Sequence, residues 1–370
     1  MLVASAPAGE GASGGEVADP ATVAATAAAT ARAGLSVALA SQPRPTSTPD
    51  APGIDIAESP VYDIPDPFLL LAAGRYYLYF SSAFGDSTNS NVPVIVGSPG
   101  HWSAISDAMP NVPSWAWPSS DGATTWDPYV VSLEGHYVMY AAPSIRGDGL
   151  PTPMHCISVS VSVGPAGPFV PVGKAPLVCQ PSLGGDIDAQ LFYDPHGPRG
   201  SSHPYYLIWK SDNNNLPSHP LTAIWAAPMS NDGLSLAGKP VVIFRPTTAW
   251  EKPVLEAPQM VLGPGDAAWL FFSSGDGYYT PDYSIGVASC DGPVGGCHTS
   301  TSGPLITSNA QGVGPGEETV FVAADHSLWL LYNPWHSRIP YEPLRPAEAV
   351  RIGWGSRGPY VAQAGTFPAP

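Results

Sequence analysis

The stretch VYDIPDPFLLLAAGRYYLYFSS (residues 61–82) decides the fold of this chain. An acidic residue, Asp66, stands beside a proline at the start of a short apolar run. A turn follows at Ala-Gly, and an aromatic run then ends in two serines. Short runs rich in aromatic and apolar side chains, separated by turn residues, are typical of β-strands. The stretch therefore predicts two strands joined by a tight turn, with Asp66 just before the first.

The same order of elements recurs four more times along the chain. In each unit a carboxylate precedes a short apolar run, a turn follows, and an aromatic run ends in small or polar residues. Turn chemistry accounts for a single Asp before Pro, but it does not favour the exchange of Asp for Glu seen here. Successive carboxylates are spaced by 61, 61, 68 and 61 residues. The five positions are Asp66, Asp127, Asp188, Glu256 and Glu317.

A period of this length, built from short strands, is typical of propeller blades. We therefore predict an all-β fold, a five-bladed β-propeller with four-stranded antiparallel blades. Further strands are expected at 156–163, 221–230 and 283–290, where Val, Ile, Tyr and Trp are frequent. The innermost strand of each propeller blade lines a central channel, so equivalent residues of the five blades should surround one axis.

The five carboxylates should accordingly converge at one mouth of the channel, where they would repel one another. Some of them must then be protonated, held by a cation, or paired with Lys or Arg. An arrangement of this cost is typical of a functional site. The repeat thus predicts both the fold and the place of its chemistry.

The chain is expected to have three parts. Residues 1–54 are rich in Ala, Gly and Pro and lack bulky apolar side chains, which predicts a mobile leader or linker. They do not contain the basic region and bulky apolar region of a clean signal peptide. Residues 55–362 should form the propeller, and residues 363–370 a tail.

Charge excludes some partners. The chain has 370 residues, with 14 Lys and Arg against 30 Asp and Glu, for a net charge of −16. Phosphate-binding proteins tend to be basic, so nucleic acid and anionic membrane surfaces are not expected as partners. No run of eighteen or more uninterrupted apolar residues is present, so no membrane span is predicted. We expect a monomer.

The four cysteines allow three disulfide pairings. We favour Cys156–Cys179 and Cys290–Cys297, because each pair is local in sequence and flanked by turn residues. Unpaired buried thiols are the alternative. Disulfides form in oxidising compartments, so two bridges would indicate an exported protein.

The ordered motifs resemble those of glycoside hydrolase family 43, the five-bladed propellers that cleave arabinose- and xylose-containing glycans. The resemblance runs from about Pro60 to Val361. It is carried by DPF with YYLYFSS in the first unit, IDAQLF with YYLIWKSD in the third, and LEAPQMV with WLFFSSG in the fourth. The closing segment AVRIGWGSRGPYVA is also similar to that of the family.

The resemblance implies an inverting glycosidase with three catalytic carboxylates. It places the general base at Asp66, the general acid at Glu256, and the residue that orients this acid and keeps it protonated at Asp188. The chemistry agrees, because glycoside hydrolysis needs one ionised carboxylate at the water and one protonated carboxyl at the leaving oxygen. A neighbouring ionised carboxylate keeps an acid protonated through like-charge repulsion.

The second unit departs from the family pattern. Trp126-Asp127-Pro128-Tyr129 stands where many members read Trp-Ala-Pro-Asp. Trp126 is a candidate wall for stacking on a sugar ring, with a core tryptophan as the alternative. This difference affects the expected substrate more than the expected reaction.

The fifth unit departs as well, since Glu317 stands where many members carry a central His. One interpretation makes Glu317 a ligand of a structural calcium ion in the channel, because calcium prefers oxygen ligands. The other pairs it with Arg345 or Arg351. The preceding GVGPG (312–316) lacks the Lys-Ser/Thr of a phosphate-binding loop. Lys210 is interpreted either as a ligand of a sugar hydroxyl or as a solvated side chain.

We expect an exported glycosidase that acts on arabinofuranosyl or xylosyl linkages of oligo- or polysaccharides and requires no cofactor. Two alternatives stay open: a non-catalytic carbohydrate-binding propeller, and a retaining propeller hydrolase in which Asp66 is the nucleophile. The residues expected to bind substrate are Trp126, Asp127, Lys210 and Glu317.

Overall fold

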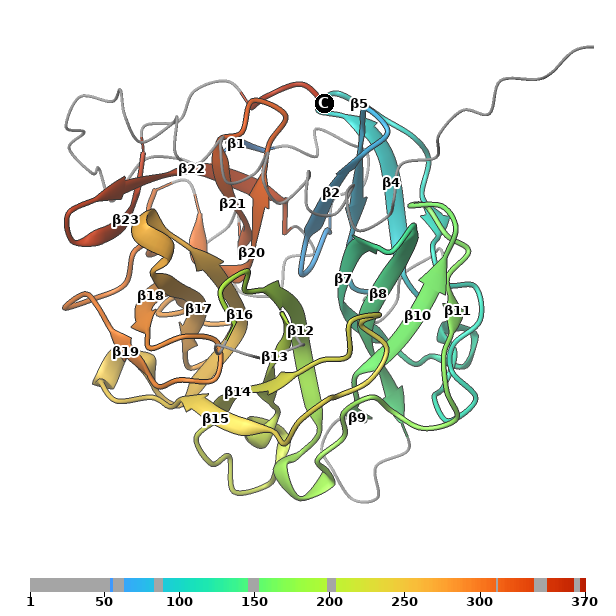
Figure 1. Ribbon diagram of the computed structural model, residues 1–370, viewed down its shortest axis with the longest axis horizontal. Coiled ribbons are helices and arrows are strands. Elements are labelled where there is room, and N and C mark those ends of the chain that lie inside the picture. The colour runs from blue at the N-terminus through green and yellow to red at the C-terminus, as the bar shows by residue number, and fades with distance from the viewer. Residues whose placement is uncertain are drawn as a thin grey trace, which may run out of the picture.

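The computed structural model contains five antiparallel sheets arranged in a ring around a central axis (Figure 1). It describes residues 54–55, 63–82, 89–145, 153–197, 204–310, 312–335, 345–362 and 367–370. Each sheet is one propeller blade, and the only helices in this described part are short 3₁₀ turns. The prediction of a five-bladed, all-β propeller is confirmed. The expected leader, 1–54, lies outside the described residues except for Ile54.

Each of the first three blades follows the chain outward from the axis. The first contains β2 (Phe68–Ala72), β3 (Arg75–Tyr79), β4 (Pro93–Ser98) and β5 (His101–Trp102), with β6 (Ser106–Asp107) also paired to β4. The second contains β7 (Thr125–Leu133), β8 (His136–Ile145), β10 (Ser158–Ser162) and β11 (Val170–Pro171), with β9 (Met154–His155) paired to β8. The third contains β12 (Asp186–Tyr193), β13 (Tyr205–Ser211), β14 (Ala223–Pro228) and β15 (Val241–Phe244).

The last two blades complete the ring. The fourth contains β16 (Val254–Leu262), β17 (Ala268–Gly275), β18 (Ser284–Cys290) and β19 (Cys297–Thr299). The fifth contains β20 (Val313–Val322), β21 (Leu328–Trp335), β22 (Glu348–Gly355) and β1 (Ile54–Asp55), with β23 (Gly358–Val361) also paired to β22. The strands predicted within 156–163, 221–230 and 283–290 are β10, β14 and β18, the third strand of their blades.

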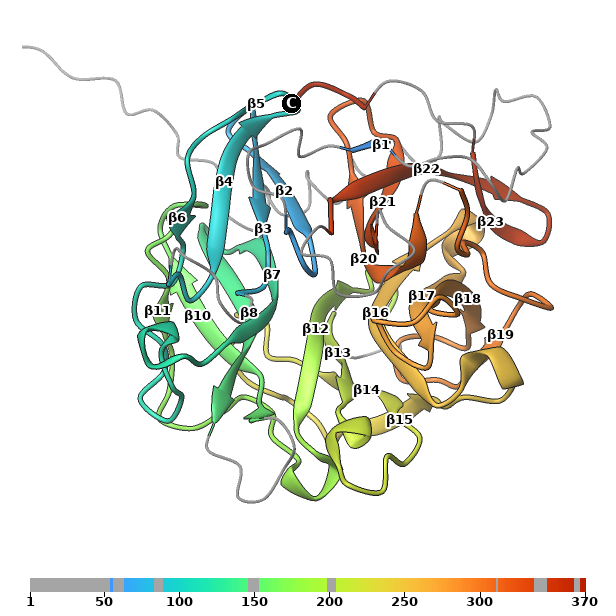
Figure 2. The same ribbon diagram turned by 180° about the vertical axis from the view of Figure 1, so that it is seen from behind.

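The innermost strands β2, β7, β12, β16 and β20 meet around the axis, each in contact with the next (Figure 2). The second strand of every blade is the aromatic run of the repeat, and it lies almost wholly in the core. The repeat therefore sets the radial order: the carboxylate end lies at the axis and the aromatic strand lies one step outward.

Hydrophobic contact is made between blades rather than at one centre. Five clusters of buried side chains occupy the five junctions of the ring. At the junction of the second and third blades, Tyr140 and Trp209 are both fully buried. Full burial of one large apolar side chain stabilises a fold by about 1.5–3 kcal/mol, so each junction holds its two blades firmly. This rigid ring fixes the positions of the inner strands.

Both ends of the described chain close the junction between the fifth and first blades. β1 precedes the first blade in sequence, yet it pairs with β22 of the fifth, with Ile54 opposite Ala349. Phe367 is buried against Tyr76, Phe321 and Trp329. Phe367 belongs to the segment predicted as a tail, 363–370, yet it packs in the core. The propeller therefore includes residues beyond 362.

The predicted disulfides Cys156–Cys179 and Cys290–Cys297 are both formed, with Cα–Cα distances of 5.0 and 4.0 Å. The first joins the chain just before β10 to the segment leading to the third blade, and the second joins β18 to β19. Within the described residues, no helix has both the length and the apolar character needed to cross a membrane.

Candidate active site

The inner strands carry a β-bulge at the axis. In the second, third, fourth and fifth blades, two residues of the inner strand face one residue of its neighbour, so one extra residue is accommodated. The first residue of each bulge has a positive φ of 48–58°, and Asp66 of the first blade has a φ of 52°. Non-glycine residues rarely adopt this left-handed conformation, which is enriched at functional sites. The five residues are Asp66, Asp127, Asp188, Ala257 and Glu317.

Glu256 is not at the position equivalent to the other four carboxylates. Ala257 occupies that position in the fourth blade, and Glu256 precedes it. Glu256 is instead equivalent to Trp126 of the second blade and Ile187 of the third, the last paired residues before the bulge. The spacing of 68 residues from Asp188 to Glu256 therefore paired two residues that are not structurally equivalent, because Glu256 lies one position before the equivalent residue. Glu256 still lies close to the other carboxylates. The hydroxyl of Tyr283 contacts both Glu256 and Glu317, and the N–H of the next residue, Ala257, donates to Asp188.

Side chains link neighbouring blades through the bulges. In every blade the N–H of the left-handed residue donates a hydrogen bond to a side-chain oxygen of the preceding blade. In the first, second and fifth blades the acceptors are Asn333 Oδ1, Ser81 Oγ and Ser273 Oγ, each at 2.8 Å. In the third and fourth they are Asp127 Oδ2 at 3.2 Å and Asp188 Oδ2 at 2.6 Å. The ring thereby holds the strained backbone in place.

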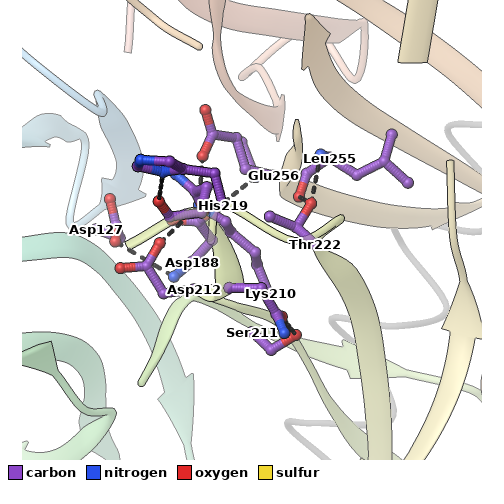
Figure 3. A network of polar contacts seen from close by, with 12 residues as sticks. Asp127, Asp188, Lys210, Ser211, Asp212, His219, Thr222, Leu255 and Glu256 are labelled. Atoms are coloured by element: carbon purple, nitrogen blue, oxygen red, sulfur yellow. Dashed lines mark hydrogen bonds and ion pairs between the residues drawn. The ribbon is translucent and has the colours of Figure 1, made fainter. Parts of the chain in front are cut away.

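Glu256 is buried, and both of its carboxylate oxygens are held by other side chains. Figure 3 draws Glu256 together with Lys210, Asp188 and Asp212. Lys210 Nζ lies 2.6 Å from Oε2, and the Tyr283 hydroxyl lies 2.6 Å from Oε1. Lys210 also contacts Asp212 Oδ1 at 3.0 Å. Burial alone would lower the pKa of Lys210, but the carboxylates of Asp212 and Glu256 outweigh it and hold this pKa well above its usual value.

The interpretation of Lys210 as a solvated side chain is wrong. Its side chain is only 1% exposed, and its ammonium group is occupied by two carboxylates. Lys210 lies on β13, directly opposite Ile187 of β12. A buried lysine with this pairing acts on Glu256 itself, and a direct contact with a sugar hydroxyl stays a prediction.

Asp188 links the segment that carries Glu256 to Asp127 of the second blade. Its Oδ2 accepts the hydrogen bond from the N–H of Ala257, which follows Glu256 in the chain. Its own N–H donates to Asp127. Burial raises the pKa of Asp188 to about 7, opposed by the nearby charge of Lys210 and increased by that of Glu256. Asp188 is thus placed to orient the backbone that carries Glu256.

Asp66, Asp127 and Glu317 form a second group of carboxylates. One oxygen of each lies within 4.8 Å of the others. Burial raises the pKa of Asp66, and Arg345 opposes this increase. Burial and the charges of Asp188 and Asp66 raise the pKa of Asp127 well above its usual value. Burial and the charges of Glu256 and Asp66 do the same for Glu317.

Among the described residues, no ion pair joins Glu317 to Arg345 or Arg351, so that interpretation is not supported. Arg345 Nε lies 3.0 Å from Asp63 Oδ1, and its guanidinium lies over the rings of Tyr278 and Trp335. Glu317 Oε1 instead contacts the Tyr283 hydroxyl at 2.7 Å. That hydroxyl also contacts Glu256, and a single hydroxyl hydrogen cannot serve two acceptors. A carboxyl proton must complete the pair of contacts, in agreement with the raised pKa of Glu317.

A cavity of about 30 Å³ lies among these carboxylates. Such a volume holds a water molecule or a small ion. Glu318 also lines the cavity, and it is buried with Oε1 lacking a hydrogen-bond partner. Carboxylate oxygens suit calcium, whose remaining ligands are often water. The donor set therefore fits an oxygen-preferring cation held by Asp66, Asp127 and Glu317.

Trp126 lies next to this group and is half-buried. One face of its indole stacks on His155, with ring centroids 3.6 Å apart and an angle of 14°. Burial lowers the pKa of His155 to about 3, so this imidazole is neutral at physiological pH. One indole face is therefore occupied by protein, and stacking of a sugar on the other stays a prediction.

Sequence reasoning missed three residues of the site: Tyr283, Arg345 as a partner of Asp63, and Glu318. Tyr283 stands outside the repeated motif, so spacing could not single it out. Glu318 is adjacent to a predicted site residue, yet only the bulge shows that both side chains reach the cavity. For Glu256 a signal did exist, because Pro67, Pro128 and Pro258 each follow the left-handed residue.

The chain belongs to glycosyl hydrolases family 43, whose family model matches residues 57–356. It is similar to a thermostable family-43 glycoside hydrolase of known crystal structure, with 25% identity, a TM-score of 0.68, and coverage of 84% of this chain and 96% of that one. Family 43 proteins are glycosidases, so this protein is a glycoside hydrolase that acts on carbohydrate.

Two further solved structures share the fold. One is an endo-1,4-beta-xylanase from Bacteroides thetaiotaomicron VPI-5482, with 22% identity, a TM-score of 0.65, and coverage of 84% of this chain and 97% of that one. The other is an alpha-L-arabinofuranosidase from Lactobacillus brevis, with 18% identity, a TM-score of 0.64, and coverage of 83% and 96%. No curated protein sequence compared with this chain matches it.

Proposed function

We propose that this glycoside hydrolase cleaves arabinofuranosyl or xylosyl linkages with inversion of the anomeric configuration. Asp66 is the general base, Glu256 is the general acid, and Asp188 orients the acid. The observation that carries this proposal is the hydrogen bond of 2.6 Å from the N–H of Ala257 to Asp188, because it ties the segment bearing Glu256 to the carboxylates around Asp66. The two disulfides support export of the enzyme.

In the proposed reaction, Asp66 takes a proton from water as the water oxygen attacks the anomeric carbon. Glu256 gives its proton to the glycosidic oxygen as the bond to the leaving sugar breaks. This transfer leaves a negative charge on Glu256. Lys210, 2.6 Å away, is placed to stabilise that charge as it develops, in a site from which water is largely excluded.

Replacement of each proposed catalytic carboxylate by its amide tests these roles. Glu256→Gln should lower kcat on a natural oligosaccharide by about 10²–10⁴-fold but slow an activated aryl glycoside much less, since a good leaving group needs little protonation. Asp66→Asn should slow both substrates to a similar extent, because attack by water is required for each.

If Glu256→Gln lowered kcat equally on the oligosaccharide and on the aryl glycoside, Glu256 would not be the general acid. Retention of configuration, seen by NMR of the first product, would instead favour Asp66 as a nucleophile. Binding of glycans without any product release by the unmodified protein would favour a carbohydrate-binding role.

We also propose a cation, with calcium as the first candidate, at Asp66, Asp127 and Glu317. The support is the closeness of their oxygens together with the unpartnered oxygen of Glu318 in the same cavity. A cation there would offset the mutual repulsion of the carboxylates, and it would not be required for the chemical step.

A further inference from the structure

Tyr283 enters the site from the loop that connects β17 to β18, and no part of the proposed reaction uses it. Its side chain is 1% exposed. The hydroxyl lies between two carboxylates of different blades, 2.6 Å from Glu256 and 2.7 Å from Glu317. The phenol thus links the carboxyl of Glu256 to a carboxyl of the neighbouring blade.

The glycine-rich start of β20 makes room for this ring. A Cβ at Gly316 would come within 1.9 Å of Tyr283 Cε1. Gly314 has a φ of 59°, and a Cβ there would lie 2.5 Å from Thr280 O, in the same loop. The segment GVGPG, which does not form a phosphate-binding loop, therefore has a structural reason: its glycines allow the loop carrying Tyr283 to pack against the inner strand.

The carboxyl of Glu256 has its two oxygens held by two different donors. Lys210 holds Oε2 and Tyr283 holds Oε1. The terminal torsion of a glutamate side chain is soft, so a single donor does not fix the plane of its carboxyl group. A lysine ammonium is a compact charge on a flexible stem, whereas the phenol hydroxyl projects from a ring held by packing. Tyr283 is the more directional of the two donors.

We propose that Tyr283 is a positioning residue that orients the Glu256 carboxyl toward the oxygen of the leaving group. The proposal rests on the function proposed above and deepens it. A general acid contributes in proportion to how much the leaving group needs a proton. Loss of the Tyr283 hydroxyl should therefore slow substrates with poor leaving groups and leave good ones nearly unchanged.

Tyr283→Phe removes the hydroxyl and keeps the ring, which makes it the informative variant. On an arabinose or xylose oligosaccharide that the unmodified enzyme cleaves, kcat should fall about 10- to 100-fold while KM stays within about twofold. On the 4-nitrophenyl glycoside of the same sugar, kcat should change by less than about threefold. Tyr332→Phe is a matched control: this buried hydroxyl donates to Glu348 at 3.1 Å in the fifth blade, and its loss should affect both substrates equally.

A second variant keeps the test decisive if Tyr283→Phe does not fold. Gly316→Ala would push the ring aside while the hydroxyl remains, and it should produce the same selective loss on the oligosaccharide. Equal losses on both substrates, or no loss on either, in the folded variants would overturn the role of Tyr283. Absence of turnover by the unmodified enzyme on every arabinosyl and xylosyl substrate would instead overturn the proposed function.

Discussion

The channel has buried carboxylates on two sides, and the charge of these carboxylates is balanced differently on each side. On the side of the proposed general acid (the acid side), Glu256 and Asp212 share the buried ammonium group of Lys210 at 2.6 and 3.0 Å. On the side of the proposed base (the base side), Asp66, Asp127 and Glu317 lie together without a lysine or arginine in ion-pair contact among the described residues. Arg345, whose charge reaches Asp66, is engaged with Asp63.

The difference teaches that a buried carboxylate group is neutralised either by a cation built into the fold or by something taken from solvent. Burial of an unpaired charge costs several kcal/mol, so a carboxyl without a cation retains a proton or binds a metal ion. The acid side carries its cation, Lys210, within the fold, whereas the base side is expected to depend on pH and on ions from solvent.

Removal of the built-in cation should have the largest effect. Lys210→Met leaves Glu256 and Asp212 buried together without their partner, and loss of one member of a buried ion pair costs about 3–5 kcal/mol. We expect that decrease in the free energy of unfolding, measured by urea denaturation. Turnover should fall as well, because Glu256 loses the donor at Oε2.

Lys239→Met is the control for this change, because Lys239 is exposed on the surface. It should alter stability by less than about 0.5 kcal/mol. A Lys210→Met variant that matches this control in stability and keeps full activity would show that the acid side does not depend on its ammonium group.

The fold could be predicted from the sequence because the repeat reports the radial order of the strands directly. The same reasoning predicted Asp66, Asp188 and Glu256 as catalytic residues through motifs that resemble those of the family, and their catalytic roles stay predictions. It aligned Glu256 with Asp188, however, because a count of residues does not show where an inner strand bulges. The proline after Ala257 was the available correction, since Pro67 and Pro128 follow Asp66 and Asp127.

The contacts of the site could not be predicted, because they join residues far apart in the chain. Lys210 ends an aromatic strand, where alternation alone does not say that a buried acceptor exists. That acceptor, Glu256, lies 46 residues further on, and it becomes a partner only when the third and fourth blades pack. Tyr283 depends in the same way on space left by Gly316, which a motif search had no reason to connect with it.

Asp186 is a buried carboxyl outside the cavity, and it allows the expected pH dependence of a buried carboxyl to be tested there. Its carboxyl is fully buried and accepts hydrogen bonds from Trp209 Nε1 at 2.9 Å and Gln180 N at 2.5 Å. Burial raises its pKa from 3.8 to about 7. The proton is therefore bound more tightly in the folded state, and its stabilising contribution is complete below about pH 4 and is lost as the pH rises through about 7.

The free energy of unfolding should accordingly decrease between pH 5 and pH 8, with a part on the order of 2–4 kcal/mol due to Asp186. Asp186→Asn cannot ionise and should flatten the pH dependence by that amount. Asp121→Asn, at an exposed position, should leave the curve unchanged. An Asp186→Asn curve with the full slope would mean that the hydrogen-bond donors alone keep this carboxylate ionised.

The smallest expected effect is that of calcium on the base side. Calcium competes with protons for carboxylate oxygens, so it should stabilise the fold more at pH 8 than at pH 5. At a concentration 100 times Kd the gain is about 2.7 kcal/mol, seen as a rise in Tm of several degrees after dialysis against chelator and re-addition of the ion. Glu317→Gln should reduce this rise, whereas Lys210→Met, on the other side of the channel, should retain it. A rise that persists in Glu317→Gln would place the ion elsewhere, and no rise at pH 8 would mean that the base side is neutralised by protons alone.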